Sequence, residues 1–378
     1  MTETAEGTTG QFRFALHDVN DRSFIPTWPG DMYNEEKYTW GDIWLNGVTS
    51  GDDGIPNFNQ VEYLNDGSYY SYVIAHEFGH ALGLSHTQSD SYLASLEHGG
   101  VEYGEDLNIG SEFNTISHLI TSYYNYYGET DIYSPHNGLP TTLMISDIAA
   151  LQYMYGVNEQ TRRGDDLYTL SSFTTNAPEP FIHATIWDTG GRDTFSWADQ
   201  SNDAQISLEA GSYSFFGAVD GLDDADLGGS LNSGSGVLGI AIGVDIENAI
   251  GGRNIDVLVG NHLDNILFGG PEFDKTDRLT GGDGADLFVC TLADASSFEF
   301  GDIIYDFTDN EDRIGLADVT FEEVSSVDAS WADDEVIKQG VRLYHTETQH
   351  TLFLLEGIAA TALDESDFQT TSFVSDFV

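Results

Sequence analysis

A nine-residue repeat rich in glycine and aspartate constrains the fold of this chain more than any other feature of its sequence. The repeat first occupies residues 251–259 and recurs in altered form over 260–268. It returns from Gly269 with three extra residues, and it occurs again over 281–289. Its glycines permit tight turns, and its apolar eighth position fits a short strand. This period and composition predict a parallel β-roll that binds calcium between its turns.

The sixth position of each repeat is expected to supply the calcium ligands, because Ca²⁺ prefers carboxylate and carbonyl oxygens. Asp286 holds this position in the complete repeat, and Asp283 offers a further carboxylate. Asp256 holds it in the first repeat, and Asp277 holds it in the stretched third repeat. The second repeat offers Asn265, which has a neutral oxygen. We therefore expect a short, imperfect roll that holds few ions.

The chain divides into two halves that differ in their residue patterns. Residues 1–160 mix helical and strand patterns, whereas residues 161–378 read as short β runs between Gly, Asp and Asn. Apolar and polar residues alternate over 11–15 and 42–46, which predicts two half-buried strands in the first half. The patterns therefore indicate an α+β domain over 1–160 and an all-β domain over 161–378.

Two helices are predicted in the first half. One covers residues 70–82, and the other begins at Ser146 as its N-cap and stops at Gly156. Asp147 suits the positive end of the dipole of the second helix. Four apolar residues of this helix lie on one face: Ile148, Leu151, Met154 and Tyr155.

The sharpest chemical signal is HEFGHALGLSH over residues 76–86. On a helix, His76 and His80 lie one turn apart on one face, so both imidazoles can reach one ion. Gly83 can take a positive φ, and the resulting turn brings His86 round as a third nitrogen ligand. Three protein ligands leave a position open for water, as in a catalytic zinc site. Glu77 is placed to take the proton of that water as a general base.

With these residues the chain resembles the metzincin zinc peptidases, and the repeat narrows the resemblance to the serralysin group. Residues 41–46 look like the edge strand that aligns an extended peptide substrate in that family. Residues 147–152 resemble the helix that closes the catalytic domain, and 243–252 resemble the start of the roll. The resemblance implies a metzincin catalytic domain followed by a C-terminal RTX β-roll.

Two departures from the family pattern fall in the first half. The family places the methionine turn Met-Ser-Tyr beneath the zinc, and the corresponding stretch here is 121–123. Tyr123 is thereby expected as an additional zinc ligand and oxyanion stabiliser, whereas Thr121 stands where the methionine would be. Only 75 residues precede His76, so the resemblance implies a catalytic domain that is shortened at its N-terminus.

The resemblance also implies calcium sites in the linker before the roll. Asp188 and Asp193 would supply carboxylates, and Glu247 would close a second cage with Asp193 and the carbonyl group of Asp245. The remaining ligands of these sites are expected among Arg162, Gly164, Asp166 and Gly190.

The function implied is that of a secreted zinc endopeptidase that holds one catalytic Zn²⁺ and several structural Ca²⁺ and cleaves protein or peptide substrates. The tail 375–378 resembles the signal read by type I secretion systems, so an extracellular, monomeric protein is expected. Two alternatives remain. One is a degenerate, non-catalytic RTX calcium-binding module, an adhesin or a pseudoprotease. The other is a matrixin-like metzincin, which fits the zinc motif but not the roll.

Charge and cysteine content narrow the range of partners. The chain has 64 acidic and 12 basic residues, a formal net charge of −52, which repels nucleic acids and anionic lipids. Neither nucleic-acid binding nor membrane insertion is expected. The single cysteine, Cys290, excludes an intrachain disulfide. We therefore expect bound metal ions to stabilise the fold instead. About six Ca²⁺ would offset only about twelve charges, so the excess indicates a saline, halophilic habitat.

This composition predicts a stability that depends on salt as well as on calcium. At saturating calcium, lowering the NaCl concentration should lower the melting temperature, because screening of the carboxylates weakens. Removing calcium at constant NaCl should unfold the C-terminal half. Thermal melts over a NaCl series measure the first effect, and a melting temperature indifferent to NaCl would contradict it.

Overall fold

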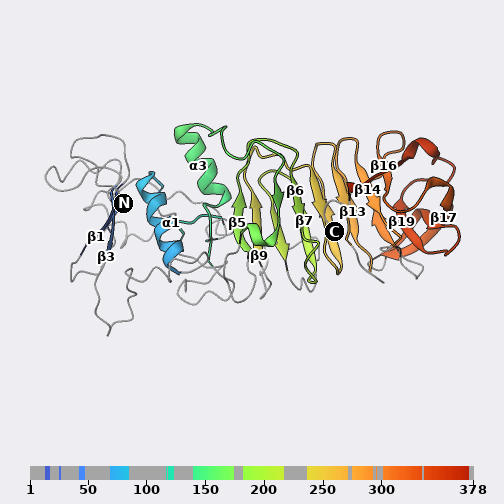
Figure 1. Ribbon diagram of the computed structural model, residues 1–378, viewed down its shortest axis with the longest axis horizontal. Coiled ribbons are helices and arrows are strands. Elements are labelled where there is room, and N and C mark those ends of the chain that lie inside the picture. The colour runs from blue at the N-terminus through green and yellow to red at the C-terminus, as the bar shows by residue number, and fades with distance from the viewer. Residues whose placement is uncertain are drawn as a thin grey trace. The chain divides into compact units, whose positions relative to one another are not determined.

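The structure is a computed structural model of the chain, and the residues that it describes fall into two compact units (Figure 1). The first unit comprises Met1–Val157, Thr174–Thr185 and Asp224–Leu231, and the second comprises Asn158–Phe173, Ile186–Asp223 and Asn232–Val378. The assignment of separate functions to residues 1–160 and 161–378 stays a prediction. The described residues are 13–17, 25–26, 42–46, 69–84, 116, 118–122, 139–173, 182–216, 236–270, 275–292, 295, 301–333 and 336–373.

The first unit contains a three-stranded sheet in the order β1-β3-β2. β1 (Arg13–His17) runs parallel to β3 (Asp42–Asn46), and β2 (Ile25–Pro26) pairs with the opposite side of β3 in antiparallel fashion. The two predicted strands are therefore present. The expectation that residues 41–46 form a sheet edge is wrong, because β3 has a paired neighbour on each side. Alternation predicts a strand but does not say which neighbours will flank it.

Among the described residues of the first unit, two helices accompany this sheet. α1 spans Tyr69–Ala81, which confirms the predicted helix. α3 spans Ile145–Tyr155 with Met144 as its N-cap, so the predicted N-cap Ser146 lies inside the helix. Gly156 ends α3 with φ 83°, a conformation that favours glycine.

α1 contributes to a small apolar core. Tyr72 of α1 packs with Ile116, Ile120 and Leu139, all nearly inaccessible to solvent. At the end of α3, Met154 and Tyr155 are 45% and 64% exposed. No helix among the described residues is long and apolar enough to cross a membrane.

The second unit is built on two sheets that take successive strands of the roll alternately (Figure 1). One sheet has seven strands in the order β20-β16-β14-β12-β10-β6-β4, and its pairs are all parallel. These strands are β4 (Leu167–Tyr168), β6 (Thr194–Ser196), β10 (Asn248–Ile250), β12 (Ile266–Phe268), β14 (Leu287–Cys290), β16 (Arg313–Leu316) and β20 (Phe368–Thr370).

The other sheet has ten strands in the order β17-β18-β19-β15-β13-β11-β7-β8-β9-β5, and its central strands are parallel. The predicted parallel roll is thereby confirmed. The strands are β5 (Ile182–Ile186), β7 (Ala204–Ser207), β8 (Tyr213–Phe216), β9 (Gly236–Ile240), β11 (Asp256–Val259), β13 (Arg278–Thr280), β15 (Asp302–Ile304), β17 (Val324–Asp333), β18 (Val336–His345) and β19 (Thr351–Glu356).

Apolar side chains stack in register along each sheet of the roll. In the first sheet Ala249 pairs with Leu267, and Leu267 pairs with Phe288, all 0% exposed. In the second sheet Leu258 pairs with Leu279, also 0% exposed. Four of these five residues are the apolar eighth positions of the repeat, which explains why that position excludes polar side chains. Each buried side chain of this size contributes roughly 1.5–3 kcal/mol of hydrophobic stabilisation.

The roll is longer than the sequence predicted. β15 and β16 continue the two parallel stacks beyond the last Gly/Asp repeat, and β19 and β20 extend them again. The antiparallel hairpin β17–β18 intervenes, and Arg278 of β13 holds it through an ion pair of 3.0 Å to Asp333. The expectation of a short roll was therefore wrong, because turns without the Gly/Asp signature can hold the same parallel strands.

The close packing of the turns predicts which glycines tolerate a side chain. A Cβ on Gly251 would overlap the carbonyl oxygen of Gly269, whereas a Cβ on Gly164 would meet nothing within 4 Å. Gly251→Ala should therefore destabilise the second unit by more than about 3 kcal/mol, and Gly164→Ala should leave it nearly unchanged. Denaturant unfolding at fixed calcium measures both. Equal midpoints would contradict the packing argument.

Candidate metal centres

α1 places two imidazole rings one turn apart on a buried face. His76 and His80 are 4% and 3% exposed, and their Nε2 atoms lie 3.0 Å apart. Their ring planes meet at 86°, so each ring presents its edge rather than its face to this point. The structure thus brings together the first two histidines of the predicted zinc set, as their spacing on a helix requires.

The other nitrogen of each ring fixes where its hydrogen lies. His76 Nδ1 is 2.8 Å from the carbonyl oxygen of Ile120, and His80 Nδ1 is 2.7 Å from that of Leu84. A carbonyl oxygen only accepts, so each Nδ1 must donate and each neutral ring keeps a lone pair on Nε2. Two such lone pairs 3.0 Å apart repel each other unless a cation or a proton lies between them. Carbonyl groups orient metal-binding histidines in this way.

Gly83 turns the chain at the end of α1, as the sequence predicted. Its φ is 101°, and its N–H donates to the carbonyl group of His80 at 2.8 Å. Glu77 lies half-buried in α1 beside His76. His86 and Tyr123 lie outside the described residues, so their roles stay predictions, as does that of Glu77.

The segment 119–122 packs against α1. Thr121 is 1% exposed, and its Cγ2 atom would lie 3.2 Å from a Cβ on Gly79. The hydroxyl group of Tyr72 donates to the carbonyl oxygen of Ser122 at 3.0 Å. Thr121, the residue that the resemblance matches to the family's methionine, therefore lies directly against the helix that carries the histidines. Its small side chain fits because Gly79 has none.

Asp147 joins α3 to this segment, a role that sequence reasoning missed. Its Oδ2 atom accepts hydrogen bonds from the N–H groups of Ile120 at 2.7 Å and Met144 at 3.0 Å. The side chain is 0% exposed, and burial raises the pKa of Asp147 to about 7 despite the two bonds. The bond to Met144 is ordinary helix capping. The bond to Ile120 has no signal in the sequence, because it joins residues 27 positions apart.

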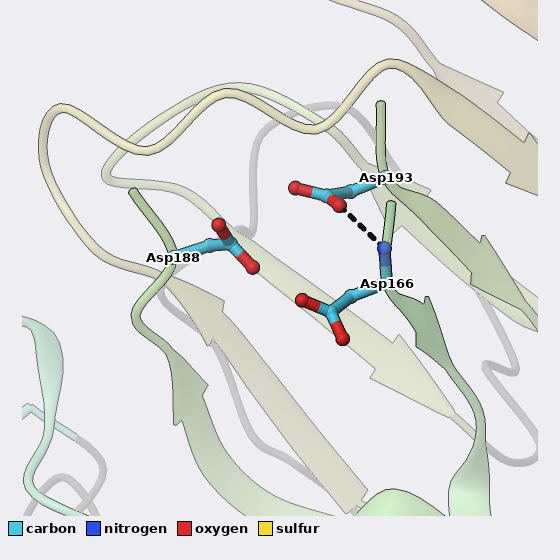
Figure 2. A group of neighbouring side chains, drawn as sticks. All are labelled: Asp166, Asp188 and Asp193. Atoms are coloured by element: carbon cyan, nitrogen blue, oxygen red, sulfur yellow. Dashed lines mark hydrogen bonds between the residues drawn. The ribbon is translucent and has the colours of Figure 1, made fainter. Parts of the chain in front are cut away.

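In the second unit three carboxylates converge (Figure 2). Asp166, Asp188 and Asp193 each offer an oxygen within 4.8 Å of the others. The N–H group of Asp166 donates to Asp193 Oδ1 at 2.8 Å, which is the dashed line in Figure 2. Asp188 is fixed by the N–H group of Gly190 at 2.9 Å and by the hydroxyl group of Tyr168. The sequence predicted the three aspartates but not Tyr168, an aromatic residue in a strand with no local signal.

The electrostatics of this cluster favour a bound cation. Asp193 is 0% exposed, and its Oδ2 atom is buried without a hydrogen bond among the described residues. Burial raises the pKa of Asp193 to about 6, and repulsion from Asp188 and Glu247 adds to the shift. Oxygen donors alone, held by backbone N–H groups, are the ligands that Ca²⁺ prefers. The residues present therefore fit calcium.

The other predicted ligands of the linker sites are only partly brought together. Glu247 Oε2 accepts from the N–H group of Asp193 at 2.7 Å, which brings the expected second cage partly together. Arg162 has φ 47°, and the carbonyl oxygen of Gly164 lies so close to Gly191 that only glycine fits there. Asp245 is exposed, and its carbonyl ligand role stays a prediction.

Carboxylates also bridge successive turns of the roll. Asp256 Oδ1 accepts from the N–H group of Ala204 at 2.6 Å, and Asp277 Oδ1 accepts from that of Asp256 at 2.7 Å. At the strands of the seven-stranded sheet, Asp286 Oδ1 accepts from the N–H group of Asn265 at 2.8 Å. Asp286 Oδ2 is buried without a hydrogen bond among the described residues. Burial raises the pKa of both Asp256 and Asp286 to about 7.

Two further aspartates continue these bridges, and sequence reasoning missed both. Asp302 accepts from the N–H group of Asp277, and Asp312 accepts from that of Asp286, each at 2.9 Å. The signal was an aspartate two residues before a buried apolar residue, as in Asp286. Asp283, predicted as an optional ligand, is exposed.

Comparisons with known proteins agree with this architecture. Residues 147–371 match the family Peptidase M10 serralysin C terminal. The chain is 37% identical to Serralysin C of Dickeya chrysanthemi over 54% of its length and 39% of that protein. It is 30% identical to Metalloprotease AprA of Pseudomonas entomophila, over 71% of this chain and 50% of that protein. With Serralysin of Photorhabdus luminescens it shares 31%, over 82% of this chain and 57% of that protein. The matches thus span about half the length of these relatives.

The aspartate cluster predicts a calcium requirement that one substitution should shift. Asp188→Asn removes a charge from the cluster, so the calcium concentration that gives half of the stabilisation should rise roughly tenfold or more. Asp199→Asn removes the same charge from an exposed position and should have no such effect. Thermal melts over a calcium series measure this midpoint. Identical midpoints in the two variants would contradict the assignment of the cluster.

Proposed function

The chain belongs to the serralysin family of M10 peptidases, and from this premise we propose that it is a secreted zinc endopeptidase stabilised by calcium. The observation that carries the catalytic half of this proposal is the close approach of the Nε2 atoms of His76 and His80, which lie 3.0 Å apart on one buried face of α1. The observation that supports the calcium half is the carboxylate cluster of Asp166, Asp188 and Asp193.

His76, His80 and His86 would hold the zinc ion, with Tyr123 as an additional ligand. When bound, zinc supplies Lewis-acid chemistry that polarises the scissile carbonyl group and acidifies water. The carboxylate of Glu77 accepts the proton of the attacking water and returns it to the leaving amine. The hydroxyl group of Tyr123 donates a hydrogen bond to the oxyanion that forms on the substrate. The substrates are extended protein or peptide chains.

Calcium would act on the second unit as a folding cofactor. The cluster that contains Asp188 and Asp193 and the turn bridges made by Asp256, Asp277 and Asp286 exist only in the folded chain, so calcium binding is coupled to folding. Glu247 and Asp166 would complete the linker sites with carbonyl oxygens of Arg162, Gly164, Gly190 and Asp245, and Asp283 would contribute at the outer face of the roll. Folding outside the cell, where calcium is abundant, fits this coupling, and export by a type I system is part of the proposal.

A non-catalytic calcium-binding module is the alternative, and one observation favours it. Thr121, which the resemblance matches to the family's methionine, packs against Gly79. A threonine there makes fewer packing contacts beneath the histidines than methionine would. The retention of Glu77 next to His76 favours the enzyme.

Substitution of Glu77 separates catalysis from metal binding. Glu77→Ala should lower casein cleavage by at least about a hundredfold, because the general base is lost. The same variant should retain one zinc per chain by atomic absorption, since the histidines remain. Glu159→Ala, at an exposed position, serves as the matched control. Equal cleavage by both variants would exclude the proposed mechanism, and no cleavage by the wild-type chain loaded with zinc and calcium would favour the non-catalytic module.

A further inference from the structure

α3 contacts both segments that would set the geometry of the zinc ligands, one at each of its ends. We propose that α3 is a two-point brace of the zinc site, in which Asp147 and Tyr155 are positioning residues that act through Ile120 and Leu82. The inference concerns residues that sequence reasoning assigned to the helix dipole (Asp147) and to the apolar face of the helix (Tyr155). Its zinc readout rests on the proposed function, whereas its structural readout does not.

The N-terminal contact of the brace acts on His76. The Asp147 carboxylate accepts the N–H group of Ile120 at 2.7 Å, and the carbonyl oxygen of the same Ile120 accepts the Nδ1–H group of His76 at 2.8 Å. Ile120 thus bonds to the Asp147 carboxylate through its N–H group and to the His76 imidazole through its carbonyl group. A second tie joins the same elements, because the N–H group of Ser146 donates to the carbonyl oxygen of His118 at 3.3 Å.

The geometry of Asp147 exceeds what capping requires. Its Oδ2 atom already accepts from Met144, which closes the first turn of α3. The additional bond to Ile120 places a fully buried carboxylate at the segment that leads to Tyr123. Displacement of Ile120 would therefore rotate the ring of His76 and shift the start of the Tyr123 segment together.

The C-terminal contact of the brace acts on the glycine turn. The hydroxyl group of Tyr155 donates to the carbonyl oxygen of Leu82 at 2.7 Å. The last carbonyl groups of a helix have no partner inside it, and Tyr155 satisfies one of these at the end of α1. Leu82 immediately precedes Gly83, where φ is 101°.

Exposure shows that Tyr155 is not placed there by burial. The side chain is 64% exposed, yet its hydroxyl oxygen and the Sδ atom of Met154 each lie 3.8 Å from the position of a Cβ on Gly83. At this end of α3 the side chain of Tyr155 therefore makes a specific contact with the carbonyl group of Leu82. Because this contact and that of Asp147 lie at opposite ends of α3, each can be removed separately.

The first experiment uses the metal-free chain and its amide hydrogen exchange. Tyr155→Phe removes only the hydroxyl group, so the amides of Gly83 and Leu84 should exchange at least about twofold to tenfold faster, the range expected for one hydrogen bond. Tyr153→Phe is the matched control, because Tyr153 is 93% exposed. Equal exchange of the 79–86 peptide in the two variants would overturn the C-terminal contact.

The second experiment separates the hydrogen bonds of Asp147 from its charge. Asn keeps an oxygen that can accept from both Ile120 and Met144, whereas Ala keeps none. Asp147→Ala should therefore speed the exchange of Ile120, and Asp147→Asn should restore protection. Similar protection of Ile120 in the Ala variant and the wild type would overturn the N-terminal contact. Should the Ala variant fail to fold, loss of protection in a folded Asn variant would overturn it equally.

Zinc affinity, measured by competition with a chelator, links the brace to the site. Tyr155→Phe should weaken zinc binding by about twofold to tenfold relative to Tyr153→Phe. Asp147→Ala should weaken it by about tenfold to a hundredfold, as for other residues that orient metal ligands, with rescue by Asn. Unchanged affinity in both variants would overturn the brace. A wild-type chain that binds no zinc would defeat the proposed function instead, and the exchange experiments on the metal-free chain would still decide the brace.

Discussion

The second unit depends on one interaction, the hydrogen bond from a backbone N–H group to a buried aspartate of the next turn. Asp277 accepts from Asp256, and Asp302 accepts from Asp277, so the same residue type both donates through its backbone and accepts through its side chain. Each bond fixes the spacing of two turns and aims a carboxylate at the interior of the roll. The buried negative charge is costly without a cation, as the raised pKa values of Asp256 and Asp286 indicate. Folding of the roll and cation binding are therefore parts of one equilibrium.

The repeat made the parallel roll predictable because its period encodes local chemistry: glycine for the turn, aspartate for the bridge and an apolar residue for the strand. The predicted repeats ended at Val289 because the next turns lack the glycines, and because the hairpin β17–β18 separates β16 from its partner β20 in the sequence. Asp302 and Asp312 continue the bridge without the rest of the motif. The bridge and the buried strand residue are thus what the fold requires, whereas the glycines mark only the tightest turns.

The geometry of the proposed zinc site was predictable only where it follows from the geometry of a helix. The spacing of His76 and His80 on α1 and the turn at Gly83 follow from helix geometry and from the conformational freedom of glycine. The carbonyl groups that orient the rings were not predictable for His76, whose partner Ile120 lies 44 residues away. For the same reason the position of β3 inside its sheet was predicted wrongly. Periodicity shows which side of an element is apolar, but the neighbours that cover it are set by tertiary contacts.

Both units use a buried aspartate that accepts backbone N–H groups, yet the two uses differ in the charge around them. Asp193 has Asp188 and Glu247 close by, so its pKa is raised by repulsion as well as by burial, and a cation relieves both costs. The causes that act on Asp147 are burial and its two backbone bonds, with no carboxylate among them. A proton can neutralise Asp147 without disturbing its bonds to Ile120 and Met144, whereas the cluster of Asp166, Asp188 and Asp193 needs a multivalent ion. The number of neighbouring carboxylates, rather than the aspartate itself, therefore distinguishes a brace from a metal ligand in this chain.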